Sequence, residues 1–422
     1  MSDNLSGRRA IPRQPRSVDP GDPRRALLLR LLKAGLERVD GRRCVREQLA
    51  RYPVAGPVWL AAVGKAAAAM ALGARDALGE SLARSLIITR DAHAPEELLR
   101  ASAVEVVASS HPVPDERSLQ AGARLLEWVE ALPAQAQPLF LISGGASSLV
   151  EVLRTGTTLE DLESFTAREL AAGTAIGELN ARRIALSQIK GGRLTARLRG
   201  RPARALFVSD VPGDDPAVIG SGLLGPSSEG ADCVHREVVA SVDDAVAAAA
   251  EAARARGLKA HAAARRFDGE ALRLAARFTH ELRLADSAVC VWGGESTVQL
   301  PPRPGKGGRN QHLALGAAKL IAGQTDLLLL AAGTDGTDGV TEDAGGLVDA
   351  DSCARVALGG LDVDLCLKGA DSGTALEASG DLVHLGPTGT NVGDLVIGLK
   401  LTVEAARRYS QVDRDAPGSR VL

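Results

Sequence analysis

Short apolar runs alternate with longer amphipathic stretches along the chain. The runs VWLAAV, SLIITR, VEVVAS and PLFLIS are followed in turn by glycine-rich or polar corners and by helical patterns. Continuous apolar runs of roughly four to eight residues are typical of strands that are buried on both faces of a parallel sheet. This order of strand, loop and helix predicts an α/β protein with a mostly parallel sheet flanked by helices.

The same alternation resumes after residue 230, around SAVCVWGGE, TDLLLLAAGTDG and DLVIGL. We therefore expect two α/β domains, each with a mostly parallel sheet flanked by helices, and a cleft between them. A Rossmann-like N-terminal domain is predicted at 25–255. A C-terminal domain is predicted at 256–422, with a final segment that is free to pack back on the first domain. Residues 1–24 combine charge and proline without an apolar core, which is typical of a disordered tail and not of a secretory signal.

The composition of the chain argues against some classes of binding partner. The chain of 422 residues has a formal net charge of −2 and only 2% aromatic residues, which argues against nucleic-acid binding. No apolar run is long enough to span a membrane. Five dispersed cysteines without metal-ligand spacing predict reduced thiols and a cytoplasmic location.

The predicted strand ends are rich in glycine. In open α/β sheets, ligands bind at the carboxyl ends of the strands, and glycine allows backbone N–H groups to approach an anion closely. One such loop alone is usually only a turn, but a set of six favours a polyanion site. The six loops are Val63–Lys65, Ser143–Ser148, Ser209–Asp215, Trp292–Thr297, Gly333–Gly336 and Gly386–Asn391.

Lysine is scarce, with eight lysines among 50 basic residues, and four of the eight are next to glycine. Lysine is a compact point charge that suits a phosphate oxygen. We expect Lys65 and Lys190 to contact phosphate, whereas Lys368 reads as an ordinary surface lysine.

The stretch AVIGSGLLGPSS contains the glycine spacing of a dinucleotide-binding fingerprint, at Gly220, Gly222 and Gly225. That fingerprint has to follow its strand directly and open a helix. Here the predicted strand ends near Asp210, and a loop-forming segment follows the glycines. The spacing therefore does not predict nicotinamide binding, and the chain has no Walker motif either.

Two further groups of polar residues are candidates for binding. In the SGGASS loop, Ser147 begins a helix, so this loop reads either as an anion cradle or as a plain serine N-cap. The second group lies in LNARRIALSQIKGGRL, where the paired glycines end a helix that can approach a ligand. The candidates from both groups are Ser143, Gly144, Gly145, Ser147, Asn180, Arg183, Lys190, Gly191 and Gly192.

The densest carboxylate cluster lies in SDVPGDD. Mg²⁺ prefers one or two carboxylates completed by water and phosphate oxygens, so Asp210 or Asp214 is the predicted metal ligand, with a turn-stabilising role as the alternative. Asp335 and Asp338 are second candidates for the metal or for a base, although Asx turns explain them almost as well. Glu295 is predicted either to contact the nucleotide or the metal, or to pair with Arg309.

Taken together and in order, several motifs resemble the glycerate 2-kinase family, two-domain kinases whose C-terminal part is called the MOFRL domain. The motifs include VGKAAAAMA, SSHPVPDE, LISGGASSLV, SDVPGDDPAVIGSG, GKGGRNQ, GTDGTDG and GPTGTNVGDL. The resemblance implies transfer of a phosphoryl group from ATP to the 2-hydroxyl of D-glycerate, with Mg²⁺, in a cleft between the domains. It implies that Lys65 and Arg309 are the catalytic cations. The motifs add these binding residues: Gly64, Glu295, Gly307, Gly308, Asn310 and Asp335.

Some positions depart from the family pattern. Ala146 stands where a third glycine is usual, and His312 where an acid is common. These departures leave the choice of acceptor open, but they remove no charged catalytic group. A nicotinamide-dependent hydroxypyruvate reductase and a non-catalytic metabolite-binding relative remain as alternatives. The predicted partners are D-glycerate and ATP, with no nucleic acid and no membrane, and a homodimer stays open.

Overall fold

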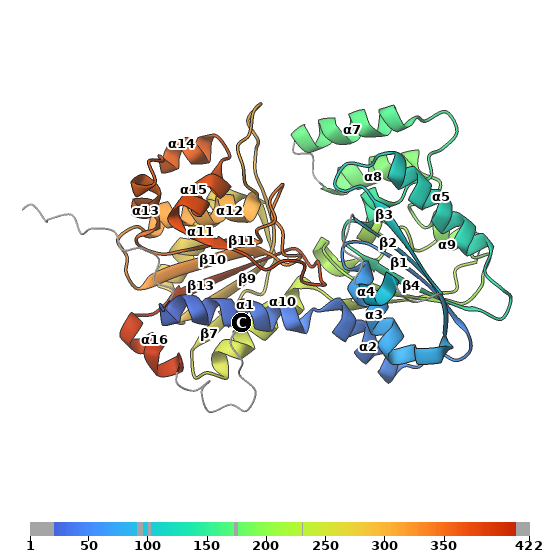
Figure 1. The fold of residues 1–422 in the computed structure, drawn as a ribbon, viewed down its shortest axis with the longest axis horizontal. Coiled ribbons are helices and arrows are strands. Elements are labelled where there is room, and N and C mark those ends of the chain that lie inside the picture. Colours follow the sequence, from blue (N-terminus) through green and yellow to red (C-terminus); the bar gives the residue numbers. More distant parts are fainter. Residues whose placement is uncertain (1–20, 91–95, 100–102, 173–175, 230, 411–422) are drawn as a thin grey trace, which may run out of the picture.

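The computed structural model describes residues 21–90, 96–99, 103–172, 176–229 and 231–410. Two β-sheets lie side by side, each flanked by helices (Figure 1). The predicted class of two α/β domains is confirmed. Most of the tail predicted at 1–24 and the segment after residue 410 lie outside the described residues. No described helix has the length and apolar character that a membrane crossing requires.

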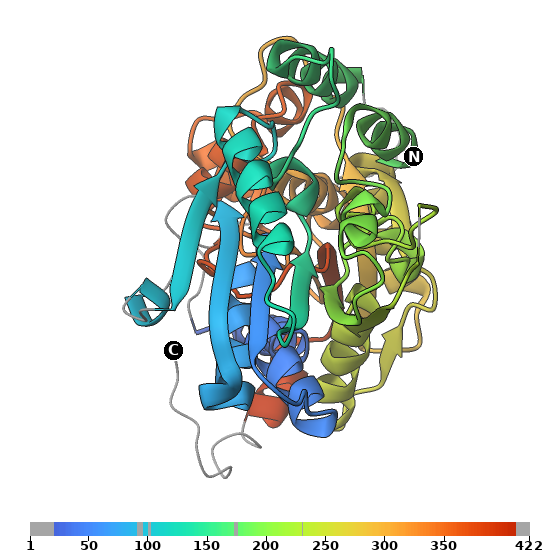
Figure 2. The ribbon, with the colours of Figure 1, turned by 90° about the vertical axis from the view of Figure 1, so that its right-hand side faces the viewer.

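The first sheet has six strands in the order β3-β2-β1-β4-β5-β6, and all neighbouring strands are parallel (Figure 2). Its strands are β1 (Val58–Val63), β2 (Leu82–Arg90), β3 (Val104–Ser109), β4 (Gln137–Ser143), β5 (Ala203–Val208) and β6 (Val234–Ala240). The order reverses between β1 and β4. In doubly wound sheets, ligands bind outside the carboxyl ends of the strands at such a switch point.

Helices cover both faces of this sheet, because successive strand residues point to opposite faces. Leu60 and Ala62 pack toward α2 and α3, whereas Ala61 and Val63 pack toward α5 and α9. The helices of this half are α2 (Gly41–Arg51), α3 (Ala67–Leu78), α4 (Glu96–Leu99), α5 (Glu116–Glu130), α6 (Ala146–Leu149), α7 (Leu159–Ala172), α8 (Ile176–Leu186) and α9 (Arg193–Arg197).

The second sheet is mixed, whereas the sequence predicts a mostly parallel one. Its order is β12-β11-β10-β13-β9-β7, with β8 paired to β9. The strands are β7 (Ala260–Ala262), β8 (Phe267–Glu270), β9 (Val289–Thr297), β10 (Leu327–Gly333), β11 (Gly345–Val348), β12 (Leu382–Val383) and β13 (Asp394–Lys400). The difference arises because β13 pairs antiparallel with both β9 and β10, and β11 pairs antiparallel with both β10 and β12. A buried strand gives the same apolar run in either direction.

Two helices from the first part of the chain cover one face of the second sheet. They are α1 (Pro23–Arg38) and α10 (Val242–Arg254), which pack on each other and on β13 and β9 (Figure 1). Their apolar side chains belong to one core that reaches both sheets. The predicted division at residues 255 and 256 stays a prediction.

The remaining helices are α11 (Ala271–Leu284), α12 (Arg309–Ile321), α13 (Ser352–Leu358), α14 (Val363–Lys368), α15 (Ser372–Ser379) and α16 (Val403–Ser410). Most of them lie on the other face and at the edge of the second sheet, whereas α16 packs on α1. Of these, α11 and α12 pack on each other above the second sheet.

Candidate active site

The switch point of the first sheet is built from the loops that follow β1 and β4. Lys65 N donates to Gly144 O at 2.9 Å, and Ala66 N donates to Ser143 Oγ at 3.0 Å. Gly64 has a φ of +136°, and a Cβ there would lie 2.1 Å from Ser143 Oγ. Only glycine therefore allows the two loops to lie this close.

Lys65 crosses from this switch point to the second half of the chain. Its Nζ donates to Asp335 Oδ2 at 2.7 Å, and the two side chains are 18% and 10% exposed. Burial alone would raise the pKa of Asp335, but the Lys65 ammonium and hydrogen bonds from Thr337 hold it below its ordinary value. The loops after β1 and β10 thus meet through a largely desolvated ion pair.

Arg309 is the first residue of α12 and is surrounded by acidic groups. Its guanidinium contacts Glu295 Oε1 and reaches Asp394 Oδ2 from Nε at 2.9 Å. Asp394 is buried and also accepts from Asn310 Nδ2 at 2.9 Å. Burial opposes the charged guanidinium, yet Asp394 and Glu295 raise the pKa of Arg309.

Asp338 caps the same helix. Its carboxylate accepts from Asn310 N at 3.2 Å and from Gln311 N at 2.7 Å. Burial raises the pKa of Asp338 to about 7 despite these bonds. A Cβ at Gly308 would lie 2.3 Å from Asp338 Cγ, so the glycine lets the cap approach the helix start. Gly307 and Gly308 form the turn that leads into α12.

Asp210, just after β5, lies among charges from both halves. Asn391 Nδ2 donates to its Oδ2 at 3.3 Å, and a Cβ at Gly144 would lie 1.9 Å from that oxygen. Burial and the charge of Glu295 raise the pKa of Asp210 to about 6, while Lys65 and Arg309 both oppose the rise. Lys65 and Arg309 therefore influence one carboxylate from opposite halves of the molecule.

His111 joins this group. Its ring lies over Gly145, where an added Cβ would be 3.1 Å from His111 Cδ2 and 3.2 Å from Lys65 Cγ. Burial and the nearby Lys65 charge lower the pKa of His111 to about 3. The next helix, α5, is capped by Asp115 and not by His111. His111 is thus a neutral ring beside Lys65.

The structure pairs Lys190 with a carboxylate and does not leave it available to a phosphate. Lys190 is fully buried and ion-paired with Glu151. The N–H groups of Gly191 and Gly192 donate to Ser221 O and Gly222 O. The pattern KGGR cannot show this, because Glu151 is 39 residues away in the sequence.

Ser147 and Arg183 do lie next to the β4 loop. Ser147 Oγ is 2.6 Å from Ser221 Oγ, and Arg183 Nη1 donates to Ser147 Oγ at 3.3 Å. Ser147 makes no capping bond to α6, whose N-cap is Gly145. Asn180 belongs to α8, but its side chain lies outside the described residues.

The two predicted metal ligands have different surroundings. Asp214 is held by both terminal nitrogens of Arg266, at 2.9 and 2.5 Å, so its oxygens are committed. Asp210 fits a cation better, because its raised pKa reflects burial beside a second carboxylate, Glu295. Among the described residues, no three His, Cys, Asp or Glu side chains converge as a metal cluster. Mg²⁺ needs only one or two protein carboxylates when phosphate supplies other ligands.

Asp394 is absent from the residues predicted as a site, and Asn391 is predicted only as the end of one of the six glycine-rich loops. Both belong to GTNVGDL, which carries the resemblance only as a motif. The signal that could have found Asp394 is an acidic residue directly before the apolar run LVIGL, because a carboxylate at a buried strand start needs a cationic partner.

The glycines of GSGLLG lie in turns. Gly220 is inside a short 3₁₀ turn and Gly222 has a φ of +68°. The next α-helix in the chain is α10, which begins at Val242. These glycines therefore do not form the strand-to-helix turn that a dinucleotide fingerprint needs.

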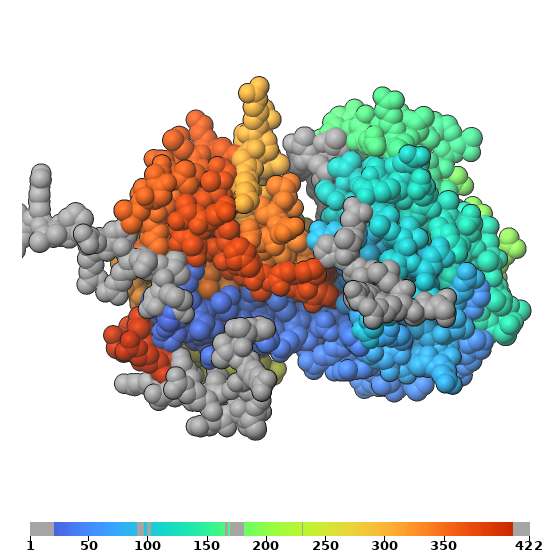
Figure 3. Space-filling model, in the orientation of Figure 1, coloured from blue at the N-terminus to red at the C-terminus, as the bar shows by residue number. Residues whose placement is uncertain are grey.

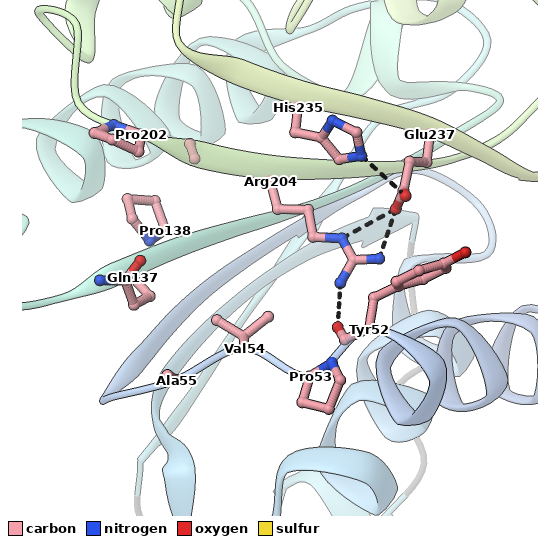
Figure 4. Close-up of a pocket in the computed structure, with 11 residues that line it drawn as sticks. Tyr52, Pro53, Val54, Ala55, Gln137, Pro138, Pro202, Arg204, His235 and Glu237 are labelled. Atoms are coloured by element: carbon pink, nitrogen blue, oxygen red, sulfur yellow. Dashed lines mark hydrogen bonds and ion pairs between the residues drawn. The ribbon is translucent and has the colours of Figure 1, made fainter.

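A shallow hollow of about 620 Å³ lies elsewhere, at the amino ends of the first-sheet strands (Figure 4). Its charged groups are already paired, since Arg204 bonds Glu237 Oε2 and Tyr52 O. All strands of this sheet are parallel, and Lys65 follows the carboxyl end of β1. The hollow therefore lies at the opposite end of the strands from Lys65.

The surface view shows a notch between the two halves, below which their chains meet (Figure 3). The fold and the contacts define a two-domain α/β protein with a charged junction at the switch point of its first sheet. This junction combines glycine-rich turns, two cations and several carboxylates. An enzyme that acts on anionic substrates requires groups of these kinds.

Known proteins share this architecture. Residues 27–253 match a domain of unknown function, DUF4147, and residues 288–394 match the MOFRL family. The D-glycerate 2-kinase of Thermotoga maritima is 36% identical over 411 residues, covering 88% of this chain and 97% of that protein. A crystal structure of glycerate kinase from the same organism superposes with a TM-score of 0.78 at 35% identity, covering 89% and 99% of the two chains.

The chain belongs to the glycerate kinase family. A 34% identical protein of Agrobacterium vitis, covering 88% of this chain and 93% of that protein, is named provisionally as a hydroxypyruvate reductase. Names within the group therefore differ.

Proposed function

We propose that this chain transfers the γ-phosphoryl group of ATP to the 2-hydroxyl of D-glycerate, with Mg²⁺, in the cytoplasm. Relatives at 31–36% identity that are glycerate kinases support the activity itself. The observation that carries the finer proposal is the Lys65–Asp335 contact, which joins the first-sheet switch point to the second half beside Asp210 and Arg309.

Phosphoryl transfer asks a protein mainly to position two substrates and to neutralise developing charge. Lys65 and Arg309 approach the junction from opposite halves, so a phosphoryl group between them would be stabilised from both sides. Arg309 suits this because its planar fork pairs with two oxygens at once. Asp394 and Glu295 hold the fork in one orientation.

Asp335 is the proposed proton acceptor. Its Oδ2 accepts a hydrogen bond from the Lys65 ammonium. A triphosphate competes for that ammonium, and Asp335 then loses the partner that lowers its pKa. In this proposal the freed carboxylate takes the proton of the attacking hydroxyl. The oxygen of that hydroxyl forms the new bond to phosphorus as the bond to ADP breaks.

Asp210 and Glu295 are the proposed carboxylates for Mg²⁺, because burial and the charge of Glu295 raise the pKa of Asp210, and a cation between the two carboxylates would relieve this cost. The ion would supply charge neutralisation to the phosphates. Asp214 is not proposed for this role, because both of its carboxylate oxygens accept hydrogen bonds from Arg266.

Phosphorus NMR of the product made from ATP, Mg²⁺ and D-glycerate tests this function. The proposal expects 2-phosphoglycerate and ADP in equal amounts. A 3-phosphate would contradict the proposed hydroxyl. Oxidation of a nicotinamide cofactor with hydroxypyruvate, and no ADP release, would favour the reductase instead. Binding without turnover across a panel of sugar acids would favour a metabolite-binding role.

A further inference from the structure

Arg183 is a buried cation with most of its hydrogen-bonding capacity unused. It is only 6% exposed. A guanidinium has five N–H donors, yet among the described residues Arg183 makes one hydrogen bond, from Nη1 to Ser147 Oγ at 3.3 Å. Its Nε is buried without a partner. Buried donors are rarely left unpaired in folded proteins, so this one points to a ligand.

The charge around Arg183 is also unbalanced. Its acidic neighbour is Glu151, whose Oε2 already holds Lys190 and whose Oε1 accepts from Val152 N at 2.9 Å. Two buried cations therefore share one carboxylate. Burial lowers the pKa of Arg183, with Glu151 opposing. Because a guanidinium stays protonated in proteins, the cluster keeps an excess positive charge that an anion would neutralise.

The position of Arg183 connects it to the junction. Ser147, its hydrogen-bond partner, is in α6 directly after the β4 loop. The positive charge of Arg183 also contributes to the low pKa of His111, whose ring lies beside Lys65. Arg183 thus lies on the first-sheet side of the junction and is more buried than Lys65.

We infer that Arg183, with the Ser147 hydroxyl, receives the carboxylate of the acceptor, a small 2-hydroxy acid. The inference rests on the proposed function and assigns the acceptor subsite within it. A single buried guanidinium matches one carboxylate through its planar fork. A triphosphate instead needs several cations in a more open site, and Lys65 and Arg309 are more exposed, at 18% and 36% of their side chains.

The subsite would set specificity. A neutral polyol of the same size would leave Arg183 buried and unpaired, so it would bind poorly. The enzyme should therefore select hydroxy acids over glycerol by charge as well as by shape.

Thermal unfolding of the full chain without ATP tests the inference apart from turnover. The ligands are D-glycerate, glycerol and inorganic phosphate, and the proteins are wild type, Arg183→Met and Arg182→Met, a change at the exposed neighbour on α8. We expect D-glycerate to raise Tm for wild type and Arg182→Met but not for Arg183→Met. Glycerol should raise none of them. Ligand-free Arg183→Met should melt at or above the wild-type Tm, because an uncompensated buried charge is gone.

Steady-state kinetics give the second readout. Arg183→Lys keeps the charge but loses the fork, so we expect its KM for D-glycerate to rise on the order of 10²-fold, while the KM for ATP changes less than about threefold. A rise in the KM for ATP alone, or a phosphate-induced Tm shift that only Arg183→Met loses, would assign Arg183 to phosphate and overturn the inference. A lower Tm for ligand-free Arg183→Met, or no Tm shift of wild type with D-glycerate, would also overturn it. Failure of the proposed function is distinct, because it appears as no phosphorylated product in the NMR experiment.

Discussion

The two sides of the junction carry opposite excess charge. On the first-sheet side, Lys65 and Arg183 stand among glycine turns with one carboxylate, Asp210, and Lys190 is neutralised by Glu151. On the second-sheet side, Arg309 is one cation among several carboxylates: Glu295, Asp335, Asp338 and Asp394. The Lys65–Asp335 pair joins the two sides.

This difference in charge explains how one junction can bind two anionic substrates together with a cation. The first side offers positive charge to the anionic groups of ATP and of the acceptor. Asp210 from the first side and Glu295 from the second offer carboxylates to a cation. The second side also offers Asp335 to a proton, and it orients Arg309. A charge change on one side should therefore alter substrate binding differently from the same change on the other side.

The largest expected effect is on the second side. Arg309→Lys keeps the positive charge but loses the bidentate fork that Asp394 orients. We expect kcat to fall by on the order of 10³-fold, as for arginines that stabilise a transferring phosphoryl group. Rapid-quench measurement of ADP release checks this, with circular dichroism to confirm folding. Near-normal turnover would refute the role of Arg309.

The next effect separates stability from catalysis on the first side. Lys190→Met leaves Glu151 buried without its cation, so the free energy of unfolding should fall by about 3 kcal/mol. Urea denaturation measures this. The double variant Lys190→Met, Glu151→Leu should recover most of the loss. Unchanged stability in the single variant would mean that this ion pair is not formed in solution.

Asp335→Asn should lower kcat by on the order of 10²-fold, because the amide cannot take a proton from the acceptor hydroxyl. The KM for ATP should stay equal or fall, since Lys65 no longer has to leave a carboxylate. Initial rates over both substrates check this. A higher KM for ATP with unchanged kcat would show instead that Asp335 only positions Lys65.

The pH dependence of stability tests the charge environment of Asp210. Its pKa of about 6 lies above the ordinary value of 3.8, so the folded protein binds this proton more tightly than the unfolded chain. The stability of wild type relative to Asp210→Asn should therefore decrease as pH rises from about 4 to about 6 and then level off. Urea denaturation across this range measures it. A difference that increases with pH would mean that Lys65 and Arg309 outweigh burial.

The smallest effect should come from Asp214→Asn. This residue pairs with Arg266 and lies in no proposed contact with substrate or Mg²⁺. We expect kcat to change by less than about threefold, with a small loss of stability as for partly exposed ion pairs. Strong loss of Mg²⁺-dependent activity would return Asp214 to the metal site.

The sequence predicts those parts of the site that depend on local order. Glycine at a strand end predicts the turns at Gly64 and Gly144, and the parallel arrangement then brings these turns together. Arg309 is predicted through GGRN, whose glycines let Asp338 cap α12. Predicting these features requires only residues that are close in the sequence and the rule that the carboxyl ends of parallel strands lie at the same side of the sheet.

Side-chain and strand pairings between residues that are distant in the sequence could not be predicted from local sequence order. Lys190 looks like a phosphate ligand until Glu151 is found beside it, and Asp214 looks like a metal ligand until Arg266 is. The direction of β13 is equally hidden, because its apolar run is the same whichever way the strand points. Tertiary pairing decides these cases.

The central claim is that Lys65 and Arg309 act on the same phosphoryl group from opposite halves. The most direct test is a double-mutant cycle of single-turnover rates for Lys65→Met, Arg309→Lys and the double variant. Residues that act as a unit are strongly non-additive, so we expect the double variant to be about as slow as the slower single variant. Rate losses that multiply would mean that the two cations act independently, and they would contradict the claim.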